Sequence, residues 1–397
     1  MKTVFRVLVL GLFAAVIMTA NTVLGLAQAD CNDLKSNTAL YQKFIDNYQS
    51  NDKAKIQIAI NSAKEYVQKY ASCADYKAQV DYLKAAPPSL EARIKQLIAA
   101  EKQAEQEKRY RTFNASLKSK NWDTLYQVGP AILEREPNLI DVIIVLGSVG
   151  LDEATKNPPN DKFNVQTVNF AKTAIQKLKA GAKSKNYGAL QYSYKSKGNA
   201  LGWLNYTVGQ IMFLRMGQKK QALPYFFEAS KANSETKKSP YLYGTIGEYY
   251  KSQVVALGKQ RGTLDAKDEA NFSKIDNLFG LEKANAERGA DAFARAYSFA
   301  LADKNASQEY RKVLRDNLKL LYDFRFKKPD ETEDTTAKMN QFVTAVMAKP
   351  LPNPSDTVMP ILEKKPEDTD TGTKTTDSSA NGTSRNRKVS EKKPGTR

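Results

Sequence analysis

The chain has 397 residues, a length that allows roughly two or three domains or one long repeat array. It contains no histidine and only two cysteines, which excludes His-based catalysis, His-ligated metal sites and four-cysteine zinc sites. The composition, 41% hydrophobic and 26% charged, is typical of a globular protein, and the formal net charge is +18.

Residues 1–29 are typical of a secretory signal peptide. Lys2 and Arg6 precede an uncharged apolar run over residues 7–18, and residues 27–29 (Ala-Gln-Ala) match a small-x-small cleavage signal. The run is shorter than the roughly 20 residues that a membrane span needs, although residues 23–26 could extend it into an uncleaved N-terminal anchor. We therefore expect an exported protein of the periplasm, cell envelope or extracellular space, with cleavage favoured over anchoring.

The two cysteines lie close to this signal. Asp30 stands directly before Cys31, where bacterial lipoproteins carry a small residue, so lipid modification is disfavoured. Two cysteines in an exported chain predict one disulfide, between Cys31 and Cys73, with two unpaired thiols as the alternative. Residues 30–88 are then expected to form an N-terminal helical hairpin closed by this bond.

From there to about residue 348 the pattern predicts helices. Apolar residues such as Ile56, Ile60 and Val67 recur at steps of three and four, and strand signals are nearly absent. Residues 85–88 (Ala-Ala-Pro-Pro) interrupt the helical pattern, and Ser89 is a suitable N-cap for a new helix. The fold class is therefore all-α.

Two segments depart from this pattern. Residues 259–277 are interpreted as a polar insertion. Residues 349–397 are rich in Pro, Thr, Ser, Asp and Lys, a composition that predicts a disordered tail. Within that tail we interpret the short apolar stretch 358–362 as an inert part of a linker rather than a docking segment.

The clearest internal unit runs over residues 206–229. Small and aromatic residues recur there at the spacing of two antiparallel helices joined at a glycine turn: Phe213, Gly217, Ala222, Phe226 and Ala229. This spacing resembles the tetratricopeptide repeat. The resemblance implies an αα-hairpin solenoid over residues 89–348, and a non-repetitive helical bundle is the alternative.

The same pattern can be placed on other segments. Residues 113–137 form a second unit, and Gly147 lies one 34-residue period after Phe113. A further unit would pair a first helix containing Tyr243, Ile246, Gly247 and Tyr250 with a second helix containing Gly289, Phe293 and Ala296. A shorter set of small residues, Ala171, Ala174 and Leu178, comes after the loop at Pro158 and Pro159.

Motifs that carry chemistry are missing. The sequence has no Gly-rich phosphate loop, no nucleophile elbow and no EF-hand spacing, so we expect a protein that is not an enzyme and needs no cofactor or metal. Trp122 and Trp203 lie beside predicted turns, where a packing role is commoner than a ligand platform.

The repeat resemblance also implies a binding surface, the concave face lined by first helices. The inward positions carried over from the family are Tyr110, Asn114, Lys118, Thr207, Arg215, Tyr241, Glu248 and Lys251. They do not reproduce the lysine–asparagine clamp that some tetratricopeptide proteins use for acidic C-terminal tails. The preferred hypothesis is an exported, non-enzymatic scaffold that binds protein or peptide partners.

The positive charge supports a second hypothesis, a cationic adhesion module that binds anionic envelope polymers or lipid headgroups. Nucleic acid is disfavoured as a partner because the export signal directs the chain away from it.

Overall fold

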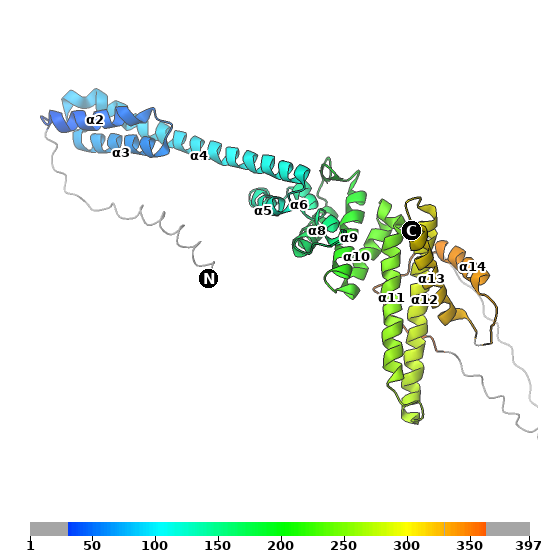
Figure 1. Cartoon of the computed structure of the whole chain (residues 1–397). Helices are drawn as coiled ribbons and strands as arrows, with labels where there is room; N and C mark the ends of the chain where they lie inside the picture. Colours follow the sequence, from blue (N-terminus) through cyan, green and yellow to red (C-terminus); the bar gives the residue numbers. More distant parts are fainter. Residues whose placement is uncertain (1–30, 329, 363–397) are drawn as a thin grey trace, which may run out of the picture. The chain divides into compact units, whose positions relative to one another are not determined.

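The computed structural model describes residues 31–328 and 330–362. The predicted signal peptide and residues 363–397 of the predicted tail lie outside the described residues. Nearly all regular structure in the described part is helical, so the all-α prediction is confirmed (Figure 1). No helix among these residues is long and apolar enough to span a membrane.

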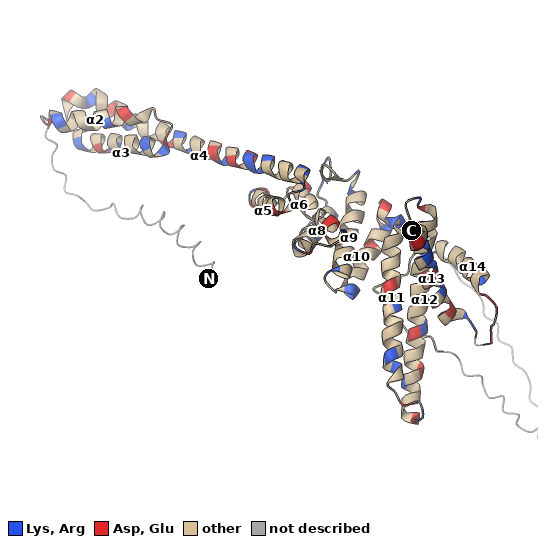
Figure 2. Cartoon of the chain, in the orientation of Figure 1, with Lys and Arg blue, Asp and Glu red and all other residues tan. Residues whose placement is uncertain are grey.

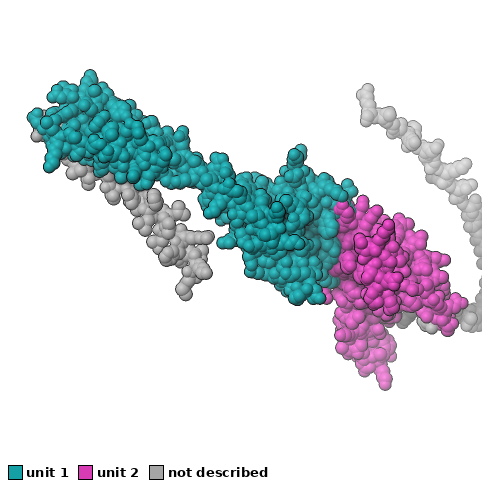
Figure 3. Space-filling model, turned by 45° about the horizontal axis from the view of Figure 1, so that its top comes forward, with its two compact units in different colours: residues 1–217, 232–234 teal, residues 218–231, 235–397 magenta. Residues whose placement is uncertain are grey.

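The chain divides into two compact units (Figure 3). Unit 1 comprises residues 1–217 and 232–234, and unit 2 comprises residues 218–231 and 235–397. The division falls between Gly217 and Gln218, inside the turn of the predicted 206–229 hairpin. Gly217 has a φ of 67°, the left-handed conformation expected of a glycine that comes after a helix.

Unit 1 contains most of the shorter elements. They are α2 (Leu34–Tyr48), α3 (Lys53–Tyr70), η1 (Ala74–Tyr76), α4 (Lys77–Ser119), α5 (Trp122–Leu133), α6 (Ile140–Leu146), α7 (Gly150–Thr155), α8 (Asn164–Lys179), β1 (Gly188–Ala189), β2 (Tyr192–Ser193) and α9 (Lys197–Leu214). The two strands pair antiparallel, with Gly188 opposite Ser193. This short hairpin was not predicted, because two residues per strand are too few to show an alternating pattern.

The N-terminal part of unit 1 is a bundle of α2, α3 and the first half of α4. Its core includes Phe44, Ile60, Tyr66 and Leu83, all fully buried. The Cys31–Cys73 disulfide is confirmed and joins the chain just before α2 to the residue that precedes η1. Disulfides of this kind form in oxidising compartments.

Helix α4 corrects the prediction of a break at residues 85–88. It continues through Pro87 and Pro88, and Ser89 does not act as an N-cap, since its hydroxyl donates a 2.8 Å hydrogen bond to the Ala86 carbonyl oxygen. Leu83 and Leu90 on either side of the prolines belong to the buried core. Burial of this face holds the helix together although two backbone donors are missing.

A second core in unit 1 forms where the end of α4 meets α5, α6 and the residue before α8. It includes Phe113, Leu117, Leu125 and Leu146. Close approach of the helices depends on glycines that the repeat pattern singled out. A Cβ on Gly129 would lie 2.8 Å from Leu146 Cδ1, and one on Gly147 would lie 2.6 Å from the Ala171 backbone nitrogen.

Unit 2 contains α10 (Lys219–Lys231), η2 (Glu235–Lys238), α11 (Pro240–Gly262), η3 (Glu269–Asn271), α12 (Phe272–Ala302), α13 (Gln308–Phe326) and α14 (Thr336–Met347). Helices α11 and α12 form a long antiparallel hairpin (Figure 1). The segment interpreted as a polar insertion, 259–277, contains the end of α11, the start of α12 and between them the connection 263–271, which includes η3.

The α11–α12 pairing matches the predicted unit whose first helix contains Gly247 and whose second helix contains Phe293. A Cβ on Gly247 would lie 2.8 Å from Phe293 ring carbons, so only glycine permits this approach. Gly289 plays the same role where α12 meets Tyr250 and Leu321. Adjacent helices thus pack in chain order, which is compatible with a helical repeat.

The first part of the predicted disordered tail is ordered. Residues 350–362 lie against α12, where the Ile361 amide donates a 3.0 Å hydrogen bond to the Gly280 carbonyl oxygen. Buried Arg295 donates to the carbonyl oxygens of Val346, Lys349 and Pro350. The interpretation of residues 358–362 as an inert linker is therefore wrong, because Pro360 and Ile361 lie directly against Gly280 of α12.

Candidate binding sites

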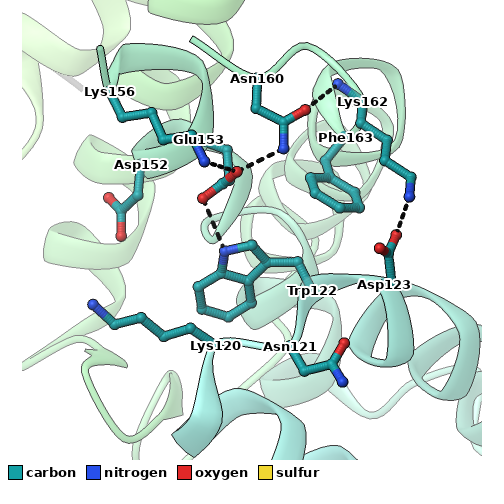
Figure 4. Close-up of a pocket in the computed structure, with 10 residues that line it drawn as sticks. All are labelled: Lys120, Asn121, Trp122, Asp123, Asp152, Glu153, Lys156, Asn160, Lys162 and Phe163. Atoms are coloured by element: carbon teal, nitrogen blue, oxygen red, sulfur yellow. Dashed lines mark hydrogen bonds and ion pairs between the residues drawn. The ribbon is translucent and has the colours of Figure 1, made fainter. Parts of the chain in front are cut away.

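A pocket of about 640 Å³ opens in unit 1 where the turn between α4 and α5 faces the end of α7 and the loop after it (Figure 4). Its lining residues are Lys120, Asn121, Trp122, Asp123, Asp152, Glu153, Lys156, Asn160, Lys162 and Phe163. Three lysines and three carboxylates thus surround two aromatic rings.

The α4–α5 turn places Trp122 in the wall. Lys120 ends α4 in the left-handed conformation with a φ of 58°, which reverses the chain. Asn121 then caps α5, its side-chain oxygen accepting a hydrogen bond from the Thr124 amide. Trp122 is consequently the first residue of α5, and its side chain is only 7% exposed. Its predicted packing role is confirmed, and its indole also forms part of the pocket wall.

Glu153 is the most fully bonded polar group of the pocket. One carboxylate oxygen accepts from the Trp122 indole nitrogen at 3.2 Å, and the other accepts from Lys156 at 2.6 Å and Asn160 at 2.7 Å. Burial works to raise the pKa of Glu153, but the hydrogen bonds from Lys156, Asn160 and Trp122 outweigh it and lower that pKa. Glu153 is therefore a charged anchor for the pocket wall.

The opposite wall is the loop that leads into α8. Asn160 fixes this loop, since its backbone amide donates to the Glu153 carbonyl oxygen and its side-chain oxygen accepts from the Lys162 amide. The Lys162 ammonium forms a 2.5 Å ion pair with Asp123, and the Phe163 ring lies beside it (Figure 4).

Two charged side chains remain available at the open side of the pocket. Lys120 makes no ion pair or hydrogen bond through its ammonium among the described residues, and Figure 4 shows it on the same side as Asp152. One oxygen of Asp152 accepts a 2.5 Å hydrogen bond from the Tyr192 hydroxyl. Burial and this bond to Asp152 both raise the pKa of Tyr192, so Tyr192 stays a neutral donor.

Unit 2 offers a second site of a different kind, the exposed face formed by α11 and α13. The Tyr241 and Tyr310 rings stack with centroids 4.6 Å apart. Further along both helices, Asn317 donates to Glu248 at 3.1 Å and accepts from Lys251 at 3.0 Å. The two helices therefore run in the same direction at this face.

These contacts occur at a constant offset. Tyr310 lies 69 positions after Tyr241, as Asn317 does after Glu248, and Val255 and Phe324 occupy the next positions at this offset. Large apolar side chains are exposed along the face: Tyr241 (54%), Val255 (53%), Val313, Leu320 (59%) and Phe324. We call this set, with Tyr310, Glu248, Lys251 and Asn317, the α11–α13 surface.

The structure brings together three of the predicted binding residues, Tyr241, Glu248 and Lys251, on this surface. Thr207 is 1% exposed within α9, so it does not offer its hydroxyl to a partner, and this corrects the prediction. Arg215 is occupied by a two-bond ion pair with Asp161, at 2.6 and 2.7 Å.

The three predicted residues on α4 differ from one another. Asn114 and Lys118 are exposed, whereas Tyr110 packs against the second core of unit 1. Burial and the carboxylate of Glu136 raise the pKa of Tyr110 to about 12. Trp203, the other predicted packing residue, is half-buried with its ring against Tyr206.

Sequence reasoning missed the pocket and the α13 half of the surface. The pocket residues come from three separate segments, and no spacing links them. For α13, the residues Tyr310, Val313, Asn317, Leu320 and Phe324 alternate at steps of three and four. That signal was present, but it could equally describe a buried stripe.

In comparisons with known proteins, no family model, curated protein or solved structure matches the chain.

Proposed function

We propose that the protein is an exported, non-enzymatic helical-repeat scaffold that binds a partner protein through the α11–α13 surface. The disulfide supports export, and the packing of successive helices around Gly129, Gly147 and Gly247 supports a repeat of the tetratricopeptide kind.

The observation that carries the proposal is the spacing of the α11–α13 surface. Its two cross-helix contacts, Tyr241 with Tyr310 and Glu248 with Asn317, lie seven residues apart, or about 10 Å along a helix. Two parallel helices with contacts at this interval form a surface against which a third helix can pack, with one of its residues at every seventh position facing a contact.

The chemistry of the pairs specifies the occupant. Tyr241 and Tyr310 at one end, and Val255 and Phe324 at the other, favour apolar side chains. Between them Glu248 and Lys251 form a 2.8 Å ion pair, so the centre is polar without a net charge. We therefore propose an amphipathic helix of a partner protein, with a neutral polar residue facing this centre.

Site-specific cross-linking in the cells of origin tests this proposal. A photo-reactive residue at Leu320 should link a discrete partner, whereas one at Val165, which is 60% exposed on α8 in unit 1, should not. The partner, once identified and purified, should bind Val255→Asp at least about tenfold more weakly than wild type.

Val165→Asp is the matched control, since it places the same charge on an equally exposed valine of the other unit. Equal binding by wild type and Val255→Asp would contradict the proposal. So would cross-links at Leu320 that contain only a second copy of this chain.

The net charge of +18 keeps the adhesion module as a second candidate. Lys and Arg are interspersed with Asp and Glu along the helices (Figure 2). Binding to a partner protein that survives about 0.5 M salt supports the scaffold, because screening at that concentration is nearly complete within a few Å. Binding to anionic vesicles that is lost in the same salt would support the adhesion module instead.

A further inference from the structure

We propose that the pocket at the α4–α5 turn is a binding site for short zwitterionic peptides, with the peptide carboxylate at Lys120 and the peptide ammonium at Asp152. This proposal concerns unit 1 alone and does not rest on the α11–α13 surface.

The first support is that some charged groups of the pocket already have hydrogen-bond or ion-pair partners among the described residues and others do not. Glu153 already accepts three hydrogen bonds, and Asp123 is paired with Lys162. A ligand cannot recruit these groups without breaking contacts that hold the wall. Lys120 and the second oxygen of Asp152 are the charged groups that a ligand can engage at no such cost.

The second support is the balance of charge. A purely anionic ligand would face the carboxylates of Asp152 and Glu153, and a purely cationic ligand would face Lys120 and Lys156. A ligand that carries both charges satisfies Lys120 and Asp152 together, and it leaves the net charge of the pocket unchanged.

The third support is size and wall chemistry. A volume of about 640 Å³ lies within the range of small-ligand sites and exceeds what a single amino acid fills. Trp122 and Phe163 provide apolar wall beside the charged groups. Short peptides meet the requirements of charge, size and wall chemistry together.

Trp122 allows the site to be observed directly. The chain has two tryptophans, so Trp203→Phe leaves the pocket indole as the sole source of tryptophan emission. In this variant of the full chain, trialanine should produce a saturable change in emission, and calorimetry on the wild-type chain should give the same affinity.

Modified peptides then assign each end. N-acetyl-trialanine lacks the ammonium and trialanine amide lacks the carboxylate, and each should bind about three- to fivefold more weakly, as expected for one exposed charge pair. Lys120→Gln should weaken trialanine by a similar factor and leave the amide unchanged. Asp152→Asn should likewise weaken the binding of trialanine and leave the binding of the acetylated peptide unchanged. Once one member of a charge pair is missing, removing the other costs nothing more, so the two losses are not additive.

Lys108→Gln and Asp75→Asn are the matched controls, because both residues are exposed and neither lines the pocket. Both controls should bind trialanine as the wild type does. Failure of trialanine to saturate either signal would overturn the proposal, and so would equal affinity for all three peptides or equal losses in the control variants.

Discussion

Single glycines determine how closely the helices of this protein approach. Four glycines lie so close to another helix that an added Cβ would displace a neighbouring group: Gly129, Gly147, Gly247 and Gly289. Their effect depends on the group opposite, since a buried ring or backbone cannot move aside as a flexible exposed side chain can.

Gly247 gives the sharpest test of this point. In Gly247→Ala the new Cβ would meet the Phe293 ring, which is 1% exposed and fixed by its surroundings. The free energy of unfolding should therefore be about 1–3 kcal/mol lower than in wild type. Gly262→Ala is the control, because nothing lies within 4 Å of its added Cβ at the end of α11. Urea unfolding measures both, and equal stability of Gly247→Ala and wild type would contradict the close approach.

Glu153 makes a pH-dependent contribution to the stability of the fold, again through a single residue. Its folded-state pKa lies below the ordinary value of 4.5, so the stabilisation is fully present above pH 4.5 and is lost as the pH falls through the lowered pKa. Glu153→Gln should therefore be less stable than wild type at pH 7, and the difference should shrink as the pH falls below 4.5. Thermal unfolding across this range tests it, and a difference that grows with acidification would refute the assigned sign.

At the scale of elements, α4 shows tertiary contacts prevailing over local preference. A proline inside a helix removes a backbone donor and crowds the preceding turn, and α4 contains two of them. Its buried side chains nevertheless belong to two cores, one at each end of the helix. Burial at both ends therefore maintains a helix whose middle carries an unfavourable local sequence.

Pro88 is exposed, so replacing it should restore helix hydrogen bonding without loss of packing. Pro88→Ala should stabilise the N-terminal bundle by about 2 kcal/mol, since the gain of a backbone bond exceeds the greater entropy of the unfolded chain. Pro87→Ala should gain less, because Pro87 is buried. Hydrogen exchange over residues 84–92 measures both, and faster exchange in Pro88→Ala would contradict the expectation.

At the scale of the whole molecule, the segment after α14 completes unit 2. Arg288 donates to the Asn353 carbonyl oxygen at 2.9 Å, and Tyr250 donates to that of Pro354 at 3.3 Å. Together with Arg295 these donors bind the segment through its backbone, so its composition alone did not reveal that it is ordered.

Two C-terminal deletions should separate the contribution of residues 350–362 from that of residues 363–397. A chain that ends at residue 349 should be less stable than wild type by about 2 kcal/mol or more, because Arg288, Arg295 and Tyr250 lose acceptors. A chain that ends at residue 362 keeps these contacts and should unfold at the wild-type temperature. Identical melting of both shortened chains would show that residues 350–362 contribute nothing.

The sequence by itself determined the helical class and the disulfide. Steps of three and four between apolar residues reflect the geometry of one helix, and two cysteines permit only one pairing. It also paired the helix that contains Gly247 with the helix that contains Phe293, because small and large residues alternate at the spacing of a helical hairpin. Such features depend on a few neighbouring positions, so a pattern can record them.

Only the tertiary structure decided the continuity of α4, the ordering of residues 350–362 and the residues that make up the two candidate binding sites. The prolines of α4 are tolerated because a distant core buries the same face, and Arg295 orders a segment that begins at Pro350, 55 residues later in the chain. Packing between helices places Lys120 and Asp152 in the lining of one pocket and stacks Tyr241 on Tyr310. Contacts between distant segments leave no spacing in the sequence, which is why these features had to be seen in three dimensions.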